Sequence, residues 1–264
     1  IVGGGIVGAA LAFYLSKANT NHHIILLDRS LRKSLGSTGH APGFVGQLNE
    51  SPVLTRLAQD TVAEYLSIPG GFNTVAGLEL ASTPAGVEAL QSRFEKARAA
   101  GLSAEIISPA EAAALAPDFI DPETITAGLR FASDGTANAQ VITSYFAREA
   151  RGRGVDFLER DVTGFTMKEE PVSAGEIAAI RTADGDIRLA GCTVILATGI
   201  WTSSLTGPGQ GRGGSITNLP VPIIPVAHPY TFTPSRPART GTPYPFVRWP
   251  EHHVYARDHG ERDG

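Results

Sequence analysis

The sequence predicts an α/β fold, and three features of the chain support this prediction. An apolar stub and a glycine run at residues 3–8 precede an alanine-rich stretch at residues 9–15, the order expected of a strand, a tight turn and a helix. A second apolar run, residues 24–27, ends in Asp28. A third, residues 193–197, is continuously apolar, as a buried parallel strand is. Together these features predict a Rossmann-like, three-layer domain that binds a dinucleotide.

The glycine run has the spacing G-x-G-x-x-G, and each glycine has a physical role in this prediction. The first permits the turn, the second lets backbone approach a pyrophosphate, and the third lets the helix pack on the strand, with the phosphates at the helix N-terminus. Asp28 follows the last glycine by twenty residues, where an acid meets a ribose hydroxyl. The alternative is a glycine-rich turn that binds nothing. The predicted dinucleotide contacts in this part of the chain are Gly3, Gly5, Ile6, Val7, Gly8 and Asp28.

A second domain is predicted to interrupt the first. Between residues 70 and 133 we expect a short strand at 78–81, a helix from Pro84 to Gly101 and another helix that begins with a capping box at Ser108. Beyond Pro220, prolines separate short β-like stretches, which suits an antiparallel sheet with proline at its edges. The expected division is a discontinuous nucleotide-binding domain at 1–69 and 134–215, and an α+β substrate domain with an antiparallel sheet at 70–133 and 216–264, truncated at its C-terminus.

The remaining elements are expected from apolar periodicity and from turn residues. Ser51 and Pro52 have the character of a helix N-cap and first helical residue. Further expected elements are a helix from 138 to about 152, strands at 155–158, around 165 and at 177–182, a hairpin turn at 184–185, a flexible loop at 206–214, and β-like stretches around 230–232, 246–247 and 253–255.

Composition narrows the class of protein. Of 264 residues, 42% are apolar and 18% are charged, as in a soluble globular protein. The net charge of −4 argues against nucleic acid or an anionic membrane as a partner, and no apolar run reaches the length of a membrane span.

The one cysteine, Cys192, is expected in the core and fits a reducing, cytoplasmic compartment. No H-x-x-H or H-E-x-x-H spacing occurs, so no metal is expected. The chain starts without methionine and ends on a polar run, so we expect a fragment.

Four stretches carry a resemblance to a known family: residues 36–43, Gln47 with Asn49, residues 133–135 and residues 255–260. On these stretches the whole chain resembles the flavin domain of the amine-oxidising family that includes D-amino acid oxidase, sarcosine oxidase and dimethylglycine dehydrogenase. It is most similar to the dimethylglycine oxidase and dehydrogenase branch. The most specific motif is the S-T-x-H-A-x-G loop that ends at Gly43. The resemblance implies FAD as the cofactor.

In that branch the loop histidine is bonded covalently to the 8α carbon of FAD, and His40 is its counterpart by position in the motif. The departure is Gly39, where the dehydrogenases usually carry tryptophan, and the alternative is a non-covalent flavin beside His40. The strand-to-glycine element that ends in Thr198 and Gly199 resembles that of two-domain flavoproteins. The further cofactor contacts that we predict are Arg29, Ser37, Thr38, His40, Val162, Thr198, Gly199 and Trp201. The resemblance places Val162 at the adenine.

For substrate chemistry the resemblance implies His228 and Tyr255 as active-site residues. A histidine can accept a proton or hold an amine neutral, and a tyrosine can hydrogen-bond that amine. His252 and His253 are expected at the surface. The implied reaction is oxidation of a small N-methylated amino acid, with hydride transfer to FAD N5 that leaves an iminium and, later, a demethylated product.

The partners that this reading implies are a small amine, and oxygen or an electron-transfer flavoprotein as the electron acceptor. In the resembled branch a folate-binding domain often follows, and it would lie outside this chain. One alternative is an oxidase of glycine or D-amino acids with non-covalent FAD. Another is a non-catalytic regulatory relative that keeps the fold. An NAD-dependent dehydrogenase is disfavoured by the inserted region and by the late Gly199 site.

Overall fold

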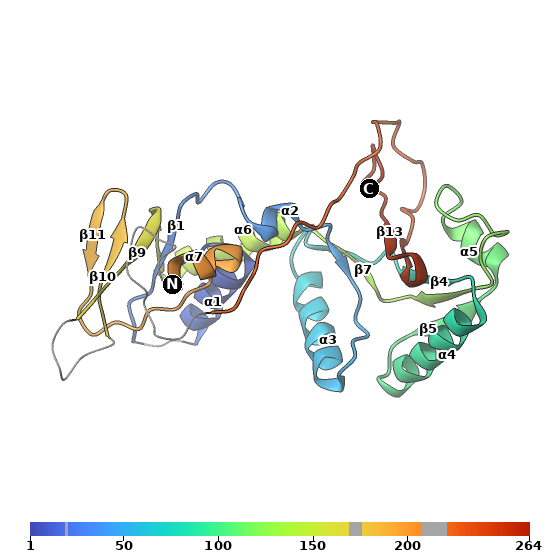
Figure 1. Ribbon diagram of the computed structural model, residues 1–264, viewed down its shortest axis with the longest axis horizontal. Helices are drawn as coiled ribbons and strands as arrows, with labels where there is room; N and C mark the ends of the chain where they lie inside the picture. Colours follow the sequence, from blue (N-terminus) through green and yellow to red (C-terminus); the bar gives the residue numbers. More distant parts are fainter. Residues whose placement is uncertain (19–20, 169–175, 207–220) are drawn as a thin grey trace. The chain divides into compact units, whose positions relative to one another are not determined.

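The computed structural model describes residues 1–18, 21–168, 176–206 and 221–264, which form two compact units (Figure 1). The first unit comprises residues 1–41 and 139–227, and the second comprises residues 42–138 and 228–264. The loop expected at 206–214 lies, beyond residue 206, outside the described residues. No helix within the described ranges is long and apolar enough to cross a membrane.

The centre of the first unit is a set of parallel extended segments. Strand β1 (Ile25–Asp28) pairs in parallel with β8 (Asp156–Glu159), and Val2 forms parallel bridges to both Leu27 and Leu196. Helices α1 (Ile6–Lys17) and α6 (Ala139–Gly152) pack against each other. The small residues Ala9 and Ala12 on α1 are fully buried. The β-α-β unit predicted at the start of the chain is therefore present.

The prediction of a buried parallel strand at 193–197 is only partly correct. The segment runs parallel to Val2, with Val2 N donating to Ile195 O at 2.9 Å and Ala197 N donating to Val2 O at 2.7 Å. It forms an isolated bridge, however, and Ile195 is 36% exposed, because among the described residues only one side of the segment is paired. Cys192, expected in the core, is exposed beside it.

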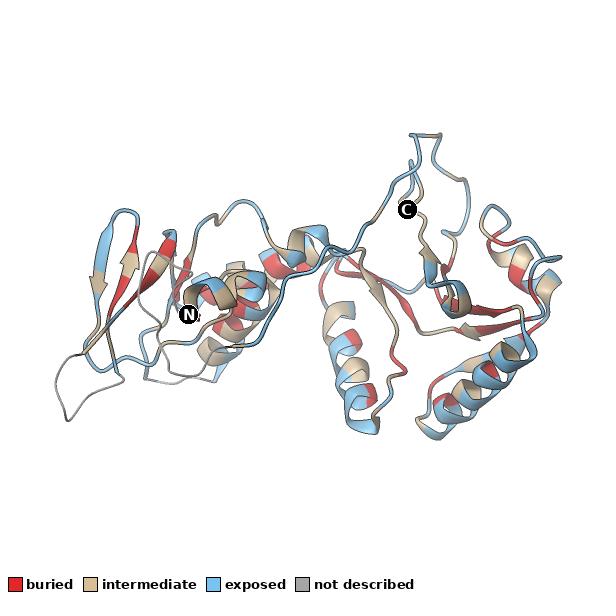
Figure 2. Cartoon of the chain, viewed as in Figure 1, coloured by how far each residue is buried: buried red, intermediate tan, exposed pale blue. Residues whose placement is uncertain are grey.

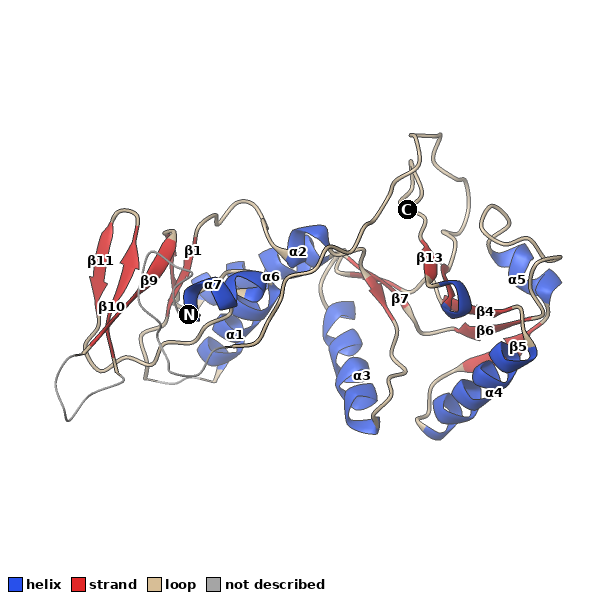
Figure 3. Cartoon of the chain, viewed as in Figure 1, coloured by secondary structure: helices blue, strands red, loops and turns tan. Residues whose placement is uncertain are grey.

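The described residues of the first unit also form a small antiparallel sheet and three short helices. Strands β9 (Val162–Met167), β10 (Ile177–Thr182) and β11 (Gly185–Arg188) pair in the order β11-β10-β9, with the expected hairpin turn at Asp184 and Gly185. The short helices, shown in blue in Figure 3, are α2 (Ser37–His40), η1 (Gly199–Trp201) and α7 (Thr202–Thr206).

The second unit is built on a five-stranded sheet in the order β13-β12-β4-β6-β5. The strands are β4 (Gly77–Ala81), β5 (Ala104–Ile107), β6 (Ala127–Phe131), β12 (Phe246–Trp249) and β13 (Val254–Ala256). The sheet is mixed rather than purely antiparallel, because β12 pairs in parallel with β4. Helix α4 (Pro84–Ala99) packs on one face through Leu90 and Ala97, and α5 (Pro109–Leu115) packs on the other through Ala112. Both faces are covered, so β4 is buried along its whole length (Figure 2).

The helix starts predicted in the second unit are capped by side chains. The Ser51 hydroxyl accepts from Val53 N at the start of α3 (Pro52–Leu66), the Thr83 hydroxyl accepts from Gly86 N at the start of α4, and Ser108 with Glu111 forms the expected capping box. The β-like stretch expected around 230–232 is not a strand, whereas those around 246–247 and 253–255 lie in β12 and β13. His252 and His253 are exposed, as expected.

The observed units divide the chain at different places from the expected boundaries. Strand β7 (Gly135–Ala137) pairs with both β2 (Phe44–Val45) and β3 (Phe72–Asn73). These hydrogen bonds hold residues 42–69 in the second unit, whereas the sequence placed them in the first. The described residues 221–227 belong to the first unit, whereas the sequence placed them in the second.

Candidate functional site

A cavity of about 250 Å³ lies in the first unit where the parallel segments end and α1 begins. This is the edge of an α/β sheet at which nucleotides bind. Of the residues predicted to contact a cofactor, the following line this cavity: Gly3, Gly5, Ile6, Val7, Asp28, Arg29, Ser37, Thr38, Val162, Thr198, Gly199 and Trp201. Gly8 and His40 are not among its lining residues.

The glycines form a turn that side chains could not occupy. Gly3 has φ +106°, and a Cβ there would lie 2.4 Å from Ala197 O. A Cβ at Gly8 would lie 1.8 Å from Gly3 O. Gly8 does not line the cavity, but the absence of a side chain there lets α1 pack directly against the turn. The floor of the cavity is therefore bare backbone at a helix N-terminus, which suits a pyrophosphate.

The Asp28 carboxylate stands at the end of β1 and faces this turn. Its Oδ2 accepts from Gly4 N at 2.6 Å, and its Oδ1 accepts from Ser30 N at 2.8 Å. Each carboxylate oxygen has more than one acceptor position. The side chain can therefore hold the turn and still accept hydrogen bonds from ribose hydroxyls.

Arg29 and Trp201 form one side of the cavity together. The Arg29 guanidinium lies 4.6 Å from the centre of the Trp201 ring, and its Nε is 3.6 Å from Asp161 Oδ1. A Cβ at Gly36 would lie 2.8 Å from the same ring, so only a glycine admits the indole there. Four further basic residues line the cavity and were not predicted from the sequence: Arg32, Lys33, Arg151 and Arg160. Together with Arg29 they outnumber the two acidic residues of the lining, Asp28 and Asp161. This excess of positive charge favours a phosphate ligand.

The motif loop that contains His40 folds into the short helix α2. Thr38 Oγ1 accepts from Ile6 N at 3.0 Å, which ties α2 to the first turn of α1. His40 ends α2 and is exposed. A Cβ at Gly39 would lie 1.8 Å from Ser34 O, so the local backbone has no room for the larger residue that the resembled dehydrogenases carry.

In the second unit, the structure brings together the two residues predicted to act on substrate. Tyr255 Oη lies 3.5 Å from His228 Nε2, and their ring centroids are 5.9 Å apart. The Tyr255 ring stacks on Phe246 at 5.5 Å and on Tyr230 at 5.8 Å, and Phe246 stacks on Phe44 at 3.7 Å. We refer to these four rings, Phe44, Phe246, Tyr255 and Tyr230, as the aromatic ladder.

Arg257 is a candidate binding residue that sequence reasoning missed. It follows Tyr255 by two residues, so the two side chains leave the chain on the same side of an extended segment. Its Nη1 donates to Pro42 O, its Nε is buried without a hydrogen bond, and it forms no ion pair with the carboxylates of the described residues. Burial lowers the pKa of this guanidinium. The signal that could have identified Arg257 from the sequence is its position in the 255–260 stretch that carries the resemblance.

The Ser133-Asp134-Gly135 stretch and Gln47 of the resemblance form a buried hydrogen-bonded network. Asp134 Oδ1 accepts from Gln47 N at 3.0 Å, and Gln47 Nε2 donates to Ser133 O at 2.8 Å. Asp134 is 3% exposed, and burial raises the pKa of its carboxyl to about 6. The described residues contain no group of three or more potential metal ligands.

Comparison with known proteins shows the family to which the chain belongs. A family model described as FAD dependent oxidoreductase (DAO) matches residues 1–264. Rattus norvegicus mitochondrial dimethylglycine dehydrogenase is 28% identical over 272 residues, which cover 100% of this chain and 30% of the relative. Mus musculus mitochondrial sarcosine dehydrogenase is 25% identical over 241 residues, which cover 88% of this chain and 25% of the relative.

Among solved structures, that of L-proline dehydrogenase from P. horikoshii has a TM-score of 0.76 at 21% identity, and the match covers 99% of this chain and 67% of the other. This likeness confirms the predicted fold class. The chain spans 25–30% of the length of the two curated relatives. Those relatives are named as mitochondrial proteins, so the cytoplasmic location stays a prediction.

Proposed function

Because the chain belongs to the FAD dependent oxidoreductase family, we propose that it is part of an enzyme that oxidises a small N-methylated amino acid of the dimethylglycine or sarcosine type. The observation that carries the proposal is the set of Arg257, Tyr255 and His228 in one unit. Arg257 forms no ion pair with the described carboxylates and follows Tyr255 by two residues, and a cation together with a tyrosine–histidine pair suits a substrate that has both a carboxylate and an amine.

The family's cofactor fits the cavity of the first unit. The N-terminal end of α1, which the glycine turn leaves open, and the nearby basic residues would hold the FAD pyrophosphate, and Asp28 would hold the ribose. When bound, FAD supplies a two-electron acceptor for the hydride of the substrate. We propose that His40 is its covalent attachment point, because α2 ties the motif to the cavity through Thr38.

The chain's own residues have three tasks in the proposed reaction. Arg257 binds the substrate carboxylate with its guanidinium. His228 accepts the amine proton, because an amine must be neutral before it can release a hydride. Tyr255 hydrogen-bonds the amine, and its hydroxyl lies 3.5 Å from His228 Nε2, which orients the imidazole. The electron acceptor that we propose is oxygen or an electron-transfer flavoprotein.

The test is the visible spectrum of the full-length protein under anaerobic conditions. Dimethylglycine, sarcosine, glycine and D-alanine would be added separately. Bleaching of the flavin by the methylated amines alone is the expected result. Bleaching by D-alanine alone would overturn the proposal and favour an amino acid oxidase.

A further inference from the structure

A second tyrosine–histidine pair lies beside the first. Tyr230 Oη is 2.7 Å from His259 Nε2, whereas the Tyr255 hydroxyl is 3.5 Å from His228. Both members of the second pair are half-buried, and His228 is exposed. The second pair is therefore the shorter and the better shielded of the two.

The two pairs are crossed between two chain segments. One segment contributes His228 and Tyr230, and the other contributes Tyr255 and His259. The two phenol rings stack at 5.8 Å with an interplanar angle of 23°. The position of one phenol therefore limits the position of the other.

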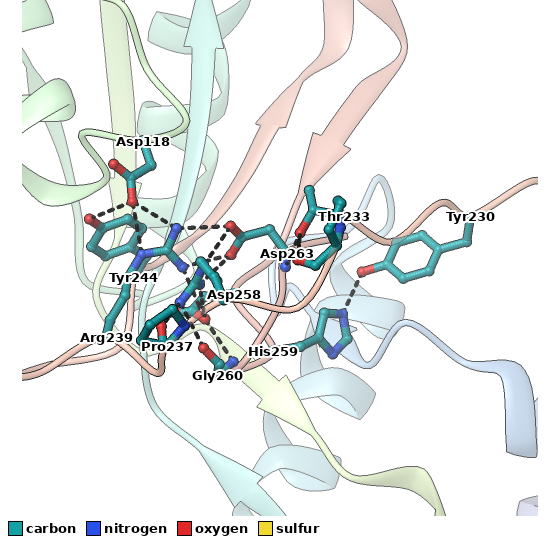
Figure 4. A network of polar contacts seen from close by, with 12 residues as sticks. Asp118, Tyr230, Thr233, Pro237, Arg239, Tyr244, Asp258, His259, Gly260 and Asp263 are labelled. Atoms are coloured by element: carbon teal, nitrogen blue, oxygen red, sulfur yellow. Dashed lines mark hydrogen bonds and ion pairs between the residues drawn. The ribbon is translucent and has the colours of Figure 1, made fainter.

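An ion-pair cluster, the arginine clasp, fastens the same two segments together (Figure 4). Arg236 reaches Asp263 Oδ1 at 2.7 Å and Asp258 Oδ1 at 3.1 Å, and Arg239 reaches Asp263 Oδ1 at 2.6 Å. Arg239 also reaches Asp118 Oδ2 at 2.8 Å, near the end of α5. The clasp holds the segment that carries Tyr230 beside the segment that carries His259.

The surroundings of His259 favour its neutral form. Burial, together with the positive charges of Arg257 and Arg262, lowers the pKa of its imidazole, and Asp258 and Asp263 act in the opposite direction. A neutral imidazole has one nitrogen that accepts, so Nε2 can take the hydrogen bond from the Tyr230 hydroxyl. Burial also raises the pKa of Tyr230, which keeps this hydroxyl protonated and able to donate.

We propose that His259 is a positioning residue for the amine-oxidising site: it fixes the Tyr230 ring through the hydroxyl, and that ring fixes the phenol of Tyr255 beside His228. This inference rests on the proposed function, in which Tyr255 contacts the amine. Small displacements of a group that contacts substrate lower rates steeply. The role requires the Tyr230 hydroxyl as well as its ring.

The experiment uses the full-length flavoprotein with Tyr230→Phe, His259→Ala and His259→Gln, and His22→Ala as an exposed control. The limiting rate of anaerobic flavin reduction by a methylated amine and its apparent Kd would be measured from pH 6 to 9. We expect Tyr230→Phe and His259→Ala to lower the limiting rate about tenfold and to leave Kd within about twofold. His259→Gln restores most of the rate, because its amide oxygen accepts the same hydrogen bond. Near-UV circular dichroism of the tyrosines should change in the two slow variants.

The outcomes separate the two proposals. Wild-type rates and pH profiles in both Tyr230→Phe and His259→Ala would overturn the positioning role and leave the proposed function intact. An equal loss of rate in His22→Ala would also overturn it. A wild-type flavin that no methylated amine bleaches would overturn the proposed function, and the positioning role with it.

Discussion

Gly8 lies directly against Gly3, and a Cβ added at Gly8 would stand 1.8 Å from the Gly3 carbonyl oxygen. The contact joins the first turn of α1 to the loop that forms the floor of the nucleotide cavity. Gly8 does not line that cavity, yet the position of the floor depends on it.

We therefore expect Gly8→Ala to weaken FAD binding without any loss of a cofactor contact. Overpacking at a close backbone contact costs about 1–3 kcal/mol, so we expect a rise of roughly fivefold to a hundredfold in the Kd for FAD. Fluorescence titration of the apoprotein with FAD would measure this Kd, in a His40→Ala background that cannot form the proposed covalent bond. Gly152→Ala in α6, where a Cβ meets nothing within 4 Å, is the matched control. An unchanged Kd in Gly8→Ala would contradict the expectation.

We expect Asp134 to make the stability of the second unit depend on pH. Its folded-state pKa is raised from 3.8 to about 6, so its favourable contribution is complete below pH 4 and is lost as the pH rises through about 6. A shift of this size corresponds to roughly 3 kcal/mol between pH 4 and 7. We expect Asp134→Asn to remove this slope, because an amide oxygen can still accept from Gln47 N.

Denaturant unfolding from pH 4 to 7 would measure the slope in wild type and in Asp134→Asn. Asp60→Asn on the exposed surface of α3 is the control, since the Asp60 side chain is 63% exposed. Parallel pH profiles for wild type and Asp134→Asn would show that the buried carboxyl does not titrate in this window.

Local signals made part of the fold predictable from the sequence. The glycine turn and the caps at Ser51 and Ser108 depend on residues within a few positions of one another, and each forms as expected. The assignment of residues 42–69 depends instead on two-residue strands that pair across about ninety positions, as Phe44 does with Thr136. So short a pairing leaves no periodic pattern in the sequence.

The candidate site shows the same limit. The predicted pair His228 and Tyr255 came from motif position, and the structure brings the two together. The second pair, Tyr230 and His259, and Arg257, which has no ion pair with the described carboxylates, depend on the crossing of two irregular segments. No spacing rule describes such segments, so only the structure reveals these residues.

His40 should retain the flavin through denaturation if it is the covalent attachment point. We expect the yellow colour of wild-type holoprotein to stay with the protein in acid or denaturant, and that of His40→Ala to leave with the solvent. His22→Ala, another exposed histidine, should keep its flavin. Absorbance of the separated fractions would measure this. Release of the flavin from the wild-type protein would contradict the covalent bond and leave non-covalent FAD.

Arg257 should determine affinity for the carboxylate of the substrate and have little influence on the chemical step. Arg257→Gln removes the charge that we place against the carboxylate, so we expect the apparent Kd of dimethylglycine to rise about a hundredfold, as for a lost charge-assisted pair, with the limiting rate of flavin reduction within about threefold. Dimethylamine, which has no carboxylate, should be affected far less. Arg98→Gln is the matched control, because Arg98 is an exposed arginine of α4 in the same unit, with its guanidinium over the Phe94 ring at 5.7 Å. Equal weakening of dimethylglycine and dimethylamine would show that Arg257 supports the fold of the site, because a carboxylate contact would discriminate between these two amines.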